Sequence, residues 1–296
     1  MSSLRNLLQG LVDYAGLFPP AAQPMAEAVE CFGEYRRCPQ AWMLGRLVVP
    51  ATRLEELEAA AGGLLPASGE SPWELSVLGE ADPSETTRAL LGLERRHPAG
   101  GIVATSVEMK APPPELLQQV LTELPNTVEV FFEIPCDDDP SPWLERLTGS
   151  RGRGKIRCGG VTEDAFPTPR QMARFLRACN GAKVPFKATA GLHHPLRGSY
   201  RLTYEPDSPS GTMFGFLNVF AAAAFLHSQE LPEEDLLALL TEEKAEAFSF
   251  SPSGLGWRDR ALSSEQVAAS RSRLALSYGS CSFREPIEDL QALDLL

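Results

Sequence analysis

From residue 43 onward the chain alternates short runs of β-forming residues with longer segments whose apolar residues recur at helical spacing. Such alternation is typical of βα units, because two parallel strands need a long crossover between them and a helix usually supplies it. At least six units can be counted before the pattern weakens. The six predicted strands span residues 43–49, 74–78, 102–107, 128–134, 155–158 and 184–189.

Six consecutive βα units predict an α/β protein with a TIM-like (β/α) barrel, formed by a single domain over residues 1–296. The length agrees, because such barrels often reach about 250 residues or more as one domain. A last strand is predicted at 247–250, but no convincing seventh barrel strand can be placed, so we expect an irregular barrel or one with fewer than eight strands. Residues 1–40 are interpreted as an N-terminal lid or rim, and residues 273–296 as a C-terminal tail.

Charge and cysteine content exclude several classes of protein. The formal net charge of −12 has the wrong sign for neutralising nucleic-acid phosphates. Six cysteines without a C-x-x-C pair predict neither a disulfide scaffold nor a structural zinc site. The chain also shows no secretory signal and no apolar stretch of the ~18 residues that a membrane span needs. A cytoplasmic protein with no membrane or nucleic-acid partner is therefore expected.

Working residues of such barrels lie where strands end, and three cationic residues occupy such positions. Lys155 and Arg157 are two residues apart on one predicted strand, so their side chains face the same side and suit a carboxylate, a phosphate or a developing enolate. Lys187 stands in the apolar run VPFKATAG, where a desolvated lysine can act as a Schiff-base nucleophile or a base. The alternative for Lys155 and Arg157 is that both face outward or pair with neighbouring acids. The alternative for Lys187 is a structural role, in which it pairs with an acid such as Glu133.

Glu133, His193 and His194 are further candidates at strand ends. A carboxylate at the end of the apolar strand VEVFFEI needs a partner, either a lysine or a metal ion. Adjacent histidines cannot both face one way on regular structure, but a loop can present one of them as an acid, a base or a metal ligand. A buried ion pair and a hydrogen-bonding histidine are the ordinary alternatives.

Three other segments are candidates for binding. Asp13 lies in DYAGLFPP, which we interpret as a packed lid or as part of the site. Residues 197–211 form a polar loop that is long enough for a lid. Ser253 and Gly254 follow the last predicted strand, where barrels often bind phosphate.

The segments GKIRCGG and FKATAG resemble strand ends of class I aldolase-type barrels. That family is similar in placing a Schiff-base lysine and a helper lysine on nearby strands. The resemblance covers only these two segments, and it implies that Lys187 or Lys155 forms the imine. An arginine beside Lys155 and two histidines after Lys187 are departures from the family pattern.

These features lead to a hypothesis and two alternatives. The hypothesis is a lyase or aldolase-like enzyme for a small anionic oxo-acid or sugar phosphate. In it Lys187 forms the imine and Lys155 is the helper. Arg157 holds the anion of the substrate, and Glu133 and one of the two histidines transfer protons. The first alternative is a divalent-metal enzyme with Glu133, His193 or His194, and Asp13 as ligands, so the cofactor is either none or a metal. The second is a non-catalytic ligand-binding barrel. The sequence does not determine whether the chain forms a homo-oligomer, and the apolar segment 213–225 is the candidate subunit contact.

Overall fold

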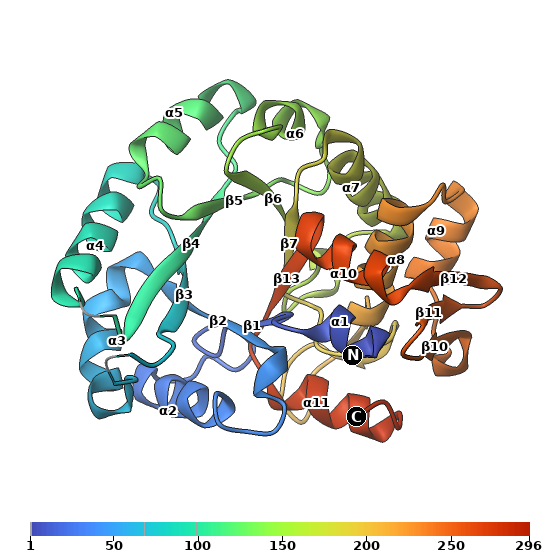
Figure 1. Cartoon of the computed structure of the whole chain (residues 1–296), viewed down its shortest axis with the longest axis horizontal. Helices are drawn as coiled ribbons and strands as arrows, with labels where there is room; N and C mark the ends of the chain where they lie inside the picture. Colours follow the sequence, from blue (N-terminus) through green and yellow to red (C-terminus); the bar gives the residue numbers. More distant parts are fainter. Residues whose placement is uncertain (1, 68, 99) are drawn as a thin grey trace.

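The computed structural model describes residues 2–67, 69–98 and 100–296, in which eight parallel strands form a closed barrel (Figure 1). Strands that follow one another in the ring are hydrogen-bonded, and β1 completes the closure by pairing with both β2 and β13. The expected TIM-like (β/α) barrel is confirmed, and its ring has eight strands. These are β1 (Val12–Tyr14), β2 (Leu44–Pro50), β3 (Trp73–Leu78), β4 (Ile102–Lys110), β5 (Glu129–Glu133), β6 (Gly152–Arg157), β7 (Phe186–Thr189) and β13 (Ala275–Ser280).

Two of the barrel strands lie in segments where the sequence predicted none. The six strands predicted between residues 43 and 189 correspond to β2 to β7, whereas β1 lies in the segment interpreted as a lid and β13 in the segment interpreted as a tail. Both interpretations are corrected, since each segment supplies a barrel strand. β1 has only three residues and β13 contains serines and a glycine, so neither shows the apolar run that marks a buried parallel strand.

Helices surround the ring, and several begin with caps that the sequence supplies (Figure 1). The Asp82 side chain accepts a hydrogen bond from the Ser84 amide at the start of α4, and Thr168 forms a capping box with Gln171 at the start of α7. No helix of the described ranges is both long and apolar enough to cross a membrane. The helices are α1 (Ser3–Leu8), α2 (Met25–Tyr35), α3 (Leu54–Ala61), α4 (Pro83–Arg96), α5 (Leu117–Glu123), α6 (Ser141–Leu147), α7 (Pro169–Ala182), α8 (Phe216–Ser228), α9 (Glu233–Leu240), α10 (Ser264–Arg273) and α11 (Arg284–Ala292).

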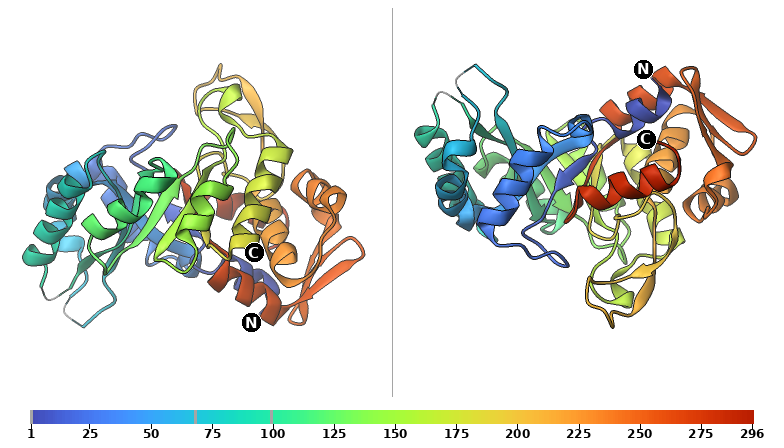
Figure 2. Two further views of the ribbon diagram at one scale, coloured as in Figure 1. Left: turned by 90° about the horizontal axis from the view of Figure 1, so that it is seen from above. Right: turned by 90° about the horizontal axis from the view of Figure 1, so that it is seen from below.

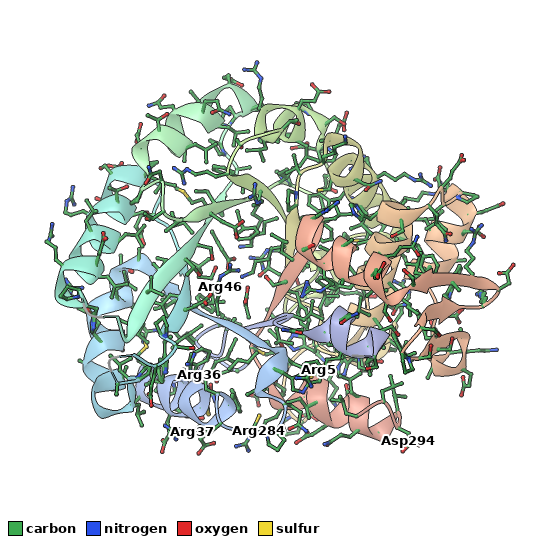
Figure 3. All side chains as sticks on the ribbon, viewed as in Figure 1. Arg5, Arg36, Arg37, Arg46, Arg284 and Asp294 are labelled. Atoms are coloured by element: carbon green, nitrogen blue, oxygen red, sulfur yellow. The ribbon has the colours of Figure 1, made fainter. Side chains whose placement is uncertain are left out.

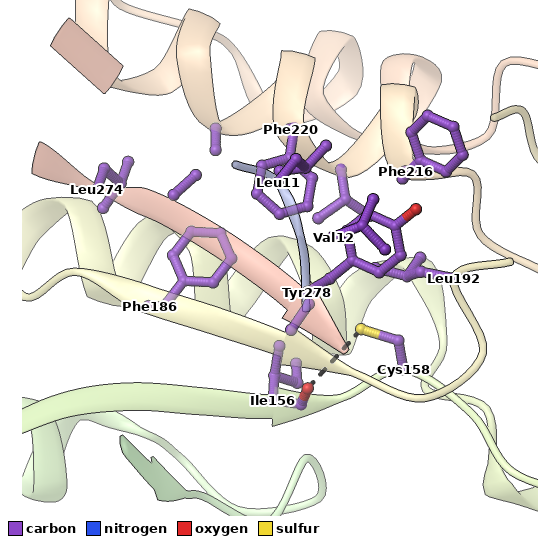
Figure 4. Close-up of a cluster of buried hydrophobic side chains, with 14 of the residues drawn as sticks. Leu11, Val12, Ile156, Cys158, Phe186, Leu192, Phe216, Phe220, Leu274 and Tyr278 are labelled. Atoms are coloured by element: carbon purple, nitrogen blue, oxygen red, sulfur yellow. Dashed lines mark hydrogen bonds between the residues drawn. The ribbon is translucent and has the colours of Figure 1, made fainter. Parts of the chain in front are cut away.

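Helix α8 is buried around its whole circumference. Its Phe220 ring lies 6.4 Å from the ring of Phe186 on β7 and 6.0 Å from that of Tyr278 on β13, in the apolar cluster of Figure 4. Helices α7, α9 and α10 pack around it. The segment 213–225 is therefore internal to its own chain, and the prediction that it forms a subunit contact is wrong.

Two small antiparallel sheets interrupt the pattern between β7 and β13. The strand predicted at 247–250 is β10 (Phe248–Phe250), which pairs with β11 (Gly254–Trp257) and β12 (Arg260–Ser263) outside the barrel. The polar loop contains a hairpin of β8 (Gly198–Arg201) and β9 (Ser210–Met213). Figure 2 shows this hairpin projecting on the side of the molecule opposite α1. Because α1 precedes β1, the hairpin stands at the C-terminal ends of the barrel strands.

Arg271 of α10 connects the N-terminal helix to the last barrel strand through hydrogen bonds. Its guanidinium donates hydrogen bonds of 2.8 to 3.0 Å to the carbonyls of Leu7, Gln9, Ala275 and Leu276. Burial lowers the pKa of Arg271 to about 10. A cation that donates to four backbone carbonyls holds the end of α1 against β13.

Candidate active site

The barrel interior contains charged side chains, whereas most barrels place branched apolar residues there. Glu133, Lys155 and Lys187 are register neighbours on β5, β6 and β7, so they point to the same face of the sheet. Further charges reach this set from β1 and β4 and from the next interior position on β6. The interior charge network, as we define it, consists of Asp13, Glu108, Glu133, Lys155, Arg157 and Lys187.

Lys187 is the most deeply buried member of the interior charge network, with no exposed surface. Its ammonium lies 2.5 Å from Oδ2 of Asp13 and donates a second hydrogen bond to Oε1 of Glu108. The Phe131 ring approaches from below at 5.9 Å. Lys187 therefore bridges two buried carboxylates, one from β1 and one from β4.

Glu108 connects the two lysines. Its Oε2 lies 2.8 Å from the ammonium of Lys155, and its Oε1 accepts a hydrogen bond of 2.6 Å from Ser76 as well as the bond from Lys187. Burial by itself would raise the pKa of Glu108, but the two ammonium groups outweigh burial and hold this pKa well below its usual range. Glu108 is thus an ionised carboxylate at neutral pH.

Lys155 stands above Lys187 in a more accessible position. Its ammonium also contacts Oε2 of Glu133 at 2.9 Å, and Oε1 of Glu133 accepts a bond of 3.1 Å from Arg157. Burial lowers the pKa of Lys155, but the carboxylates of Glu108 and Glu133 outweigh it and the pKa is raised. Burial raises the pKa of Glu133, but the two cations, Lys155 and Arg157, outweigh burial, so this pKa is lowered. The free protein therefore holds Lys155 as an ammonium.

A cavity of about 420 Å³ opens at the C-terminal ends of the strands, directly above Lys155. Glu108, Lys155 and Arg157 contribute to its floor and wall, and His193 and Cys281 contribute from the segments after β7 and β13. The remaining lining is largely apolar and includes Phe18, Pro19, Leu78 and Val161. Since barrel enzymes place their sites at this end, the cavity is the candidate active site.

His193 lies in a cluster on one wall of this cavity. Its Nδ1 is 3.2 Å from Oε2 of Glu285 on α11 and 3.9 Å from Sγ of Cys281. The hydroxyl of Tyr204, from the turn of the β8–β9 hairpin, is 3.5 Å from the same sulfur and 3.4 Å from Glu285. One nitrogen of the imidazole, Nδ1, thus faces both a carboxylate and a thiol, beneath the hairpin.

The two adjacent histidines have different surroundings. His194 points away toward α11, where its Nδ1 lies 2.6 Å from Oδ2 of Asp289, and its ring stacks on Tyr200 at 3.6 Å. Of the two, His193 lines the cavity above Lys155. This agrees with the sequence argument that only one of them can face a site.

Asp13 lies below the cavity, inside the barrel, instead of forming part of a lid. Apart from Lys187, its carboxylate accepts hydrogen bonds from the Ser277 hydroxyl at 2.8 Å and the Arg46 amide at 2.7 Å. Ala15 and Phe18, which follow β1, do reach the cavity rim. The role of Asp13 in this arrangement is to hold Lys187.

The opposite end of the barrel has its own charged layer and a second cavity of about 460 Å³. Arg46 of β2, labelled near the barrel opening in Figure 3, donates to the Thr105 hydroxyl and lies 3.5 Å from Glu129. Arg153 meets the same carboxylate at 3.1 Å. Each of these cations has a carboxylate or hydroxyl partner, so this layer is a satisfied ion-pair cluster.

Ser253 and Gly254 lie outside the barrel. The carbonyl of Gly254 accepts a hydrogen bond of 2.7 Å from Ser3 of α1, and the carbonyl of Ser253 accepts one from the Ser264 amide. Neither residue lines the cavity above Lys155. They are therefore not part of the candidate active site, because the strand before them belongs to a separate sheet, and phosphate binding by these residues stays a prediction.

Sequence reasoning did not find Glu108, Cys281 or Glu285. The third predicted strand ends at residue 107, three residues before β4 does, although Ser106 and Glu108 alternate with apolar neighbours in SVEMK. Cys281 comes directly after β13, as His193 follows β7, but that strand was not recognised. Glu285 is on a helix and meets His193 only through the fold.

No group of three or more histidine, cysteine, aspartate and glutamate side chains in the described part of the chain is placed to hold a metal ion. Glu133 is engaged by Lys155 and Arg157, and His193 by Glu285 and Cys281. The ligand set expected for the metal-enzyme alternative is thus not assembled by these residues.

Comparisons of the chain with protein-family models, with curated proteins and with solved structures found no match.

Proposed function

We propose that this chain is a lyase of the class I aldolase type, which forms an imine between Lys155 and a small anionic oxo-acid or sugar phosphate. One observation carries the proposal. Lys155 is only 4% exposed, yet it lines the cavity at the C-terminal ends of the strands, with two carboxylates within 2.9 Å of its ammonium. Lys187 is fully buried one strand away, which favours Lys155 as the imine former and Lys187 as its helper.

Imine formation requires that Lys155 first lose a proton, and the neighbouring carboxylates can accept it. When a carbonyl compound enters, the ammonium passes one proton to the Glu133 carboxylate, which it already contacts at 2.9 Å. The neutral amine attacks the carbonyl carbon, and loss of water gives the iminium. Lys187 remains charged beneath, where it holds Asp13 and Glu108 and supplies positive charge beside the reacting amine.

The cavity also fits the proposed substrate class. Arg157 lines it with a side chain that is 53% exposed, so its guanidinium retains free donors for a carboxylate or a phosphate. Its apolar walls from Phe18, Leu78 and Val161 suit a short carbon skeleton and limit water at the imine. The predicted substrate is therefore small, with a carbonyl group at one end and an anion at the other.

Borohydride trapping tests this proposal directly. Pyruvate, dihydroxyacetone phosphate and glycolaldehyde are each incubated with the protein and borohydride, and the adduct is located by peptide mass spectrometry. We expect one adduct, on Lys155, which disappears in Lys155→Met and persists in Lys244→Met, a control at an exposed lysine outside the barrel. An adduct on exposed lysines alone, unchanged in Lys155→Met, would refute the imine mechanism.

A non-catalytic ligand-binding barrel is the second candidate. The observation that favours it is the pairing of every member of the interior charge network with an opposite charge, which suffices to explain burial of these groups without catalysis. The two candidates differ in covalent chemistry. A pure binding protein would change its thermal stability with one of the three probes but would give no borohydride adduct.

A further inference from the structure

We infer that Cys281 and His193 form a thiolate–imidazolium pair that transfers the proton during carbon–carbon bond cleavage at Lys155, on a substrate whose hydroxyl lies β to the imine carbon. The inference rests on the proposed lyase function and extends it, because it assigns a proton-transfer group and restricts the substrate to aldol compounds. The imine mechanism proposed above assigns no role to Cys281 or to Glu285, the carboxylate that contacts His193.

The geometry of the cluster favours an ion pair. Cys281 is 6% exposed and lines the same cavity as Lys155, and its sulfur faces Nδ1 of His193 at 3.9 Å. The same nitrogen lies 3.2 Å from Oε2 of Glu285, whose negative charge favours an imidazolium. A positively charged imidazole beside the buried sulfur in turn favours the thiolate form of Cys281.

Hydrogen bonding completes the cluster. Tyr204 lies within 3.5 Å of both the sulfur and the Glu285 carboxylate, so its hydroxyl is placed to donate to one of these two anions. Burial raises the pKa of Tyr204, which keeps it a neutral donor across the physiological range.

The protonation equilibria point in the same direction. Burial lowers the pKa of His193, but its contacts with Cys281 and Glu285 outweigh burial and raise the pKa to about 10. Burial raises the pKa of Cys281, but His193 outweighs it and the pKa is lowered. Burial raises the pKa values of the Cys136, Cys158 and Cys179 thiols, and no histidine beside them offsets it.

The proposed step is balanced without an oxidant or reductant. The Cys281 thiolate takes the proton of the substrate β-hydroxyl, and the electron pair of that O–H bond becomes the second bond of a new carbonyl. The carbon–carbon bond breaks, and its electron pair moves toward the iminium nitrogen of Lys155 to give an enamine. The thiol then returns the proton to the enamine carbon, and water hydrolyses the resulting imine to release the second product.

The protonation state can be tested without any substrate. Iodoacetamide labelling is followed cysteine by cysteine with peptide mass spectrometry, from about pH 5 to about pH 9. At about pH 6 we expect Cys281 to react at least about tenfold faster than Cys136, which is half-buried. This advantage should disappear in His193→Asn and persist in His227→Asn, a control at a histidine outside the cavity. Equal labelling profiles of Cys281 in the wild type and His193→Asn would overturn the ion pair.

The proton-transfer role is tested with Cys281→Ser and the control Cys136→Ser. Cys281→Ser should still form the borohydride adduct at Lys155 with pyruvate, while its cleavage of the pyruvate–acetaldehyde aldol should fall at least about a hundredfold. Cleavage at the wild-type rate would overturn the role. Absence of any Lys155 adduct in the wild type would instead refute the proposed function and this role with it, and the labelling experiment would still decide whether the ion pair exists.

Discussion

Replacing Lys187 with methionine should destabilise the fold strongly at neutral pH. The side chain has no exposed surface and is shared by two carboxylates whose side chains are only 1% and 2% exposed. Methionine fills a similar volume but removes the charge. Asp13 then keeps only the Ser277 hydroxyl and the Arg46 amide as donors, and Glu108 keeps Lys155 and Ser76.

The magnitude follows from this loss of partners. Removing one member of a buried ion pair typically costs about 3 to 5 kcal/mol, because the remaining charge stays buried without compensation. Glu108 retains a second cation and Asp13 retains two hydrogen bonds, so we expect the lower part of that range, about 3 kcal/mol. The double variant Asp13→Asn with Lys187→Met removes both partners of one pair and should recover at least about 1 kcal/mol of the loss.

The expected pH dependence has a definite sign. The pKa of Glu108 in the folded protein lies well below its ordinary value, so its ion pairs stabilise the fold at pH values above that ordinary pKa. This stabilisation is lost as the pH falls through the lowered, folded-state pKa. Lys187→Met lacks one of the ion pairs of Glu108, so acid removes less stability from the variant than from the wild type. The difference in the free energy of unfolding between the two proteins should therefore be largest near neutral pH and should shrink in acid.

Urea denaturation followed by tryptophan fluorescence, at neutral pH and at about pH 3, measures these free energies of unfolding. Lys244→Met, at an exposed position, is the matched control and should change stability by less than about 0.5 kcal/mol. A Lys187→Met protein within about 1 kcal/mol of wild type at neutral pH, with the same acid response, would refute the idea of an interdependent buried charge network.

Three further predictions concern other parts of the molecule. The rate of borohydride trapping at Lys155 should rise steadily with pH above neutrality, because Glu108 and Glu133 raise the pKa of that amine and only its neutral form attacks; a rate independent of pH would contradict this mechanism. Arg271→Met should lower the free energy of unfolding by about 3 kcal/mol in urea titrations, because four backbone carbonyls lose their donor, and a loss below about 1 kcal/mol would count against this role. Ser253→Ala should leave the binding of inorganic phosphate unchanged in calorimetric titrations, because the residue lies outside the barrel; weakened binding would support the phosphate-site hypothesis.

Local sequence patterns predicted most of the barrel and part of the site. Of the strands from β2 to β7, all except β6 are rich in apolar residues, and the regular alternation of strands with capped helices made their order readable, β6 included. The two-residue spacing of Lys155 and Arg157 predicted a common face, and both side chains do line the same cavity. What made these features predictable is that each depends on neighbouring residues in one short segment.

Only the tertiary structure decided how the barrel closes and which groups meet inside it. β1 and β13 carry Asp13, Ser277 and Gly279 at interior positions, so they lack the apolar signal of a buried strand and are defined by their pairing partners. The contact between Asp13 and Lys187 joins residues 174 positions apart. His193 likewise lies 88 positions before Cys281, which shares its segment with Glu285. The sequence by itself determined the repeating βα units and the charged residues at their strand ends, whereas the partner of each charge depends on ring closure, a long-range event that no local pattern encodes.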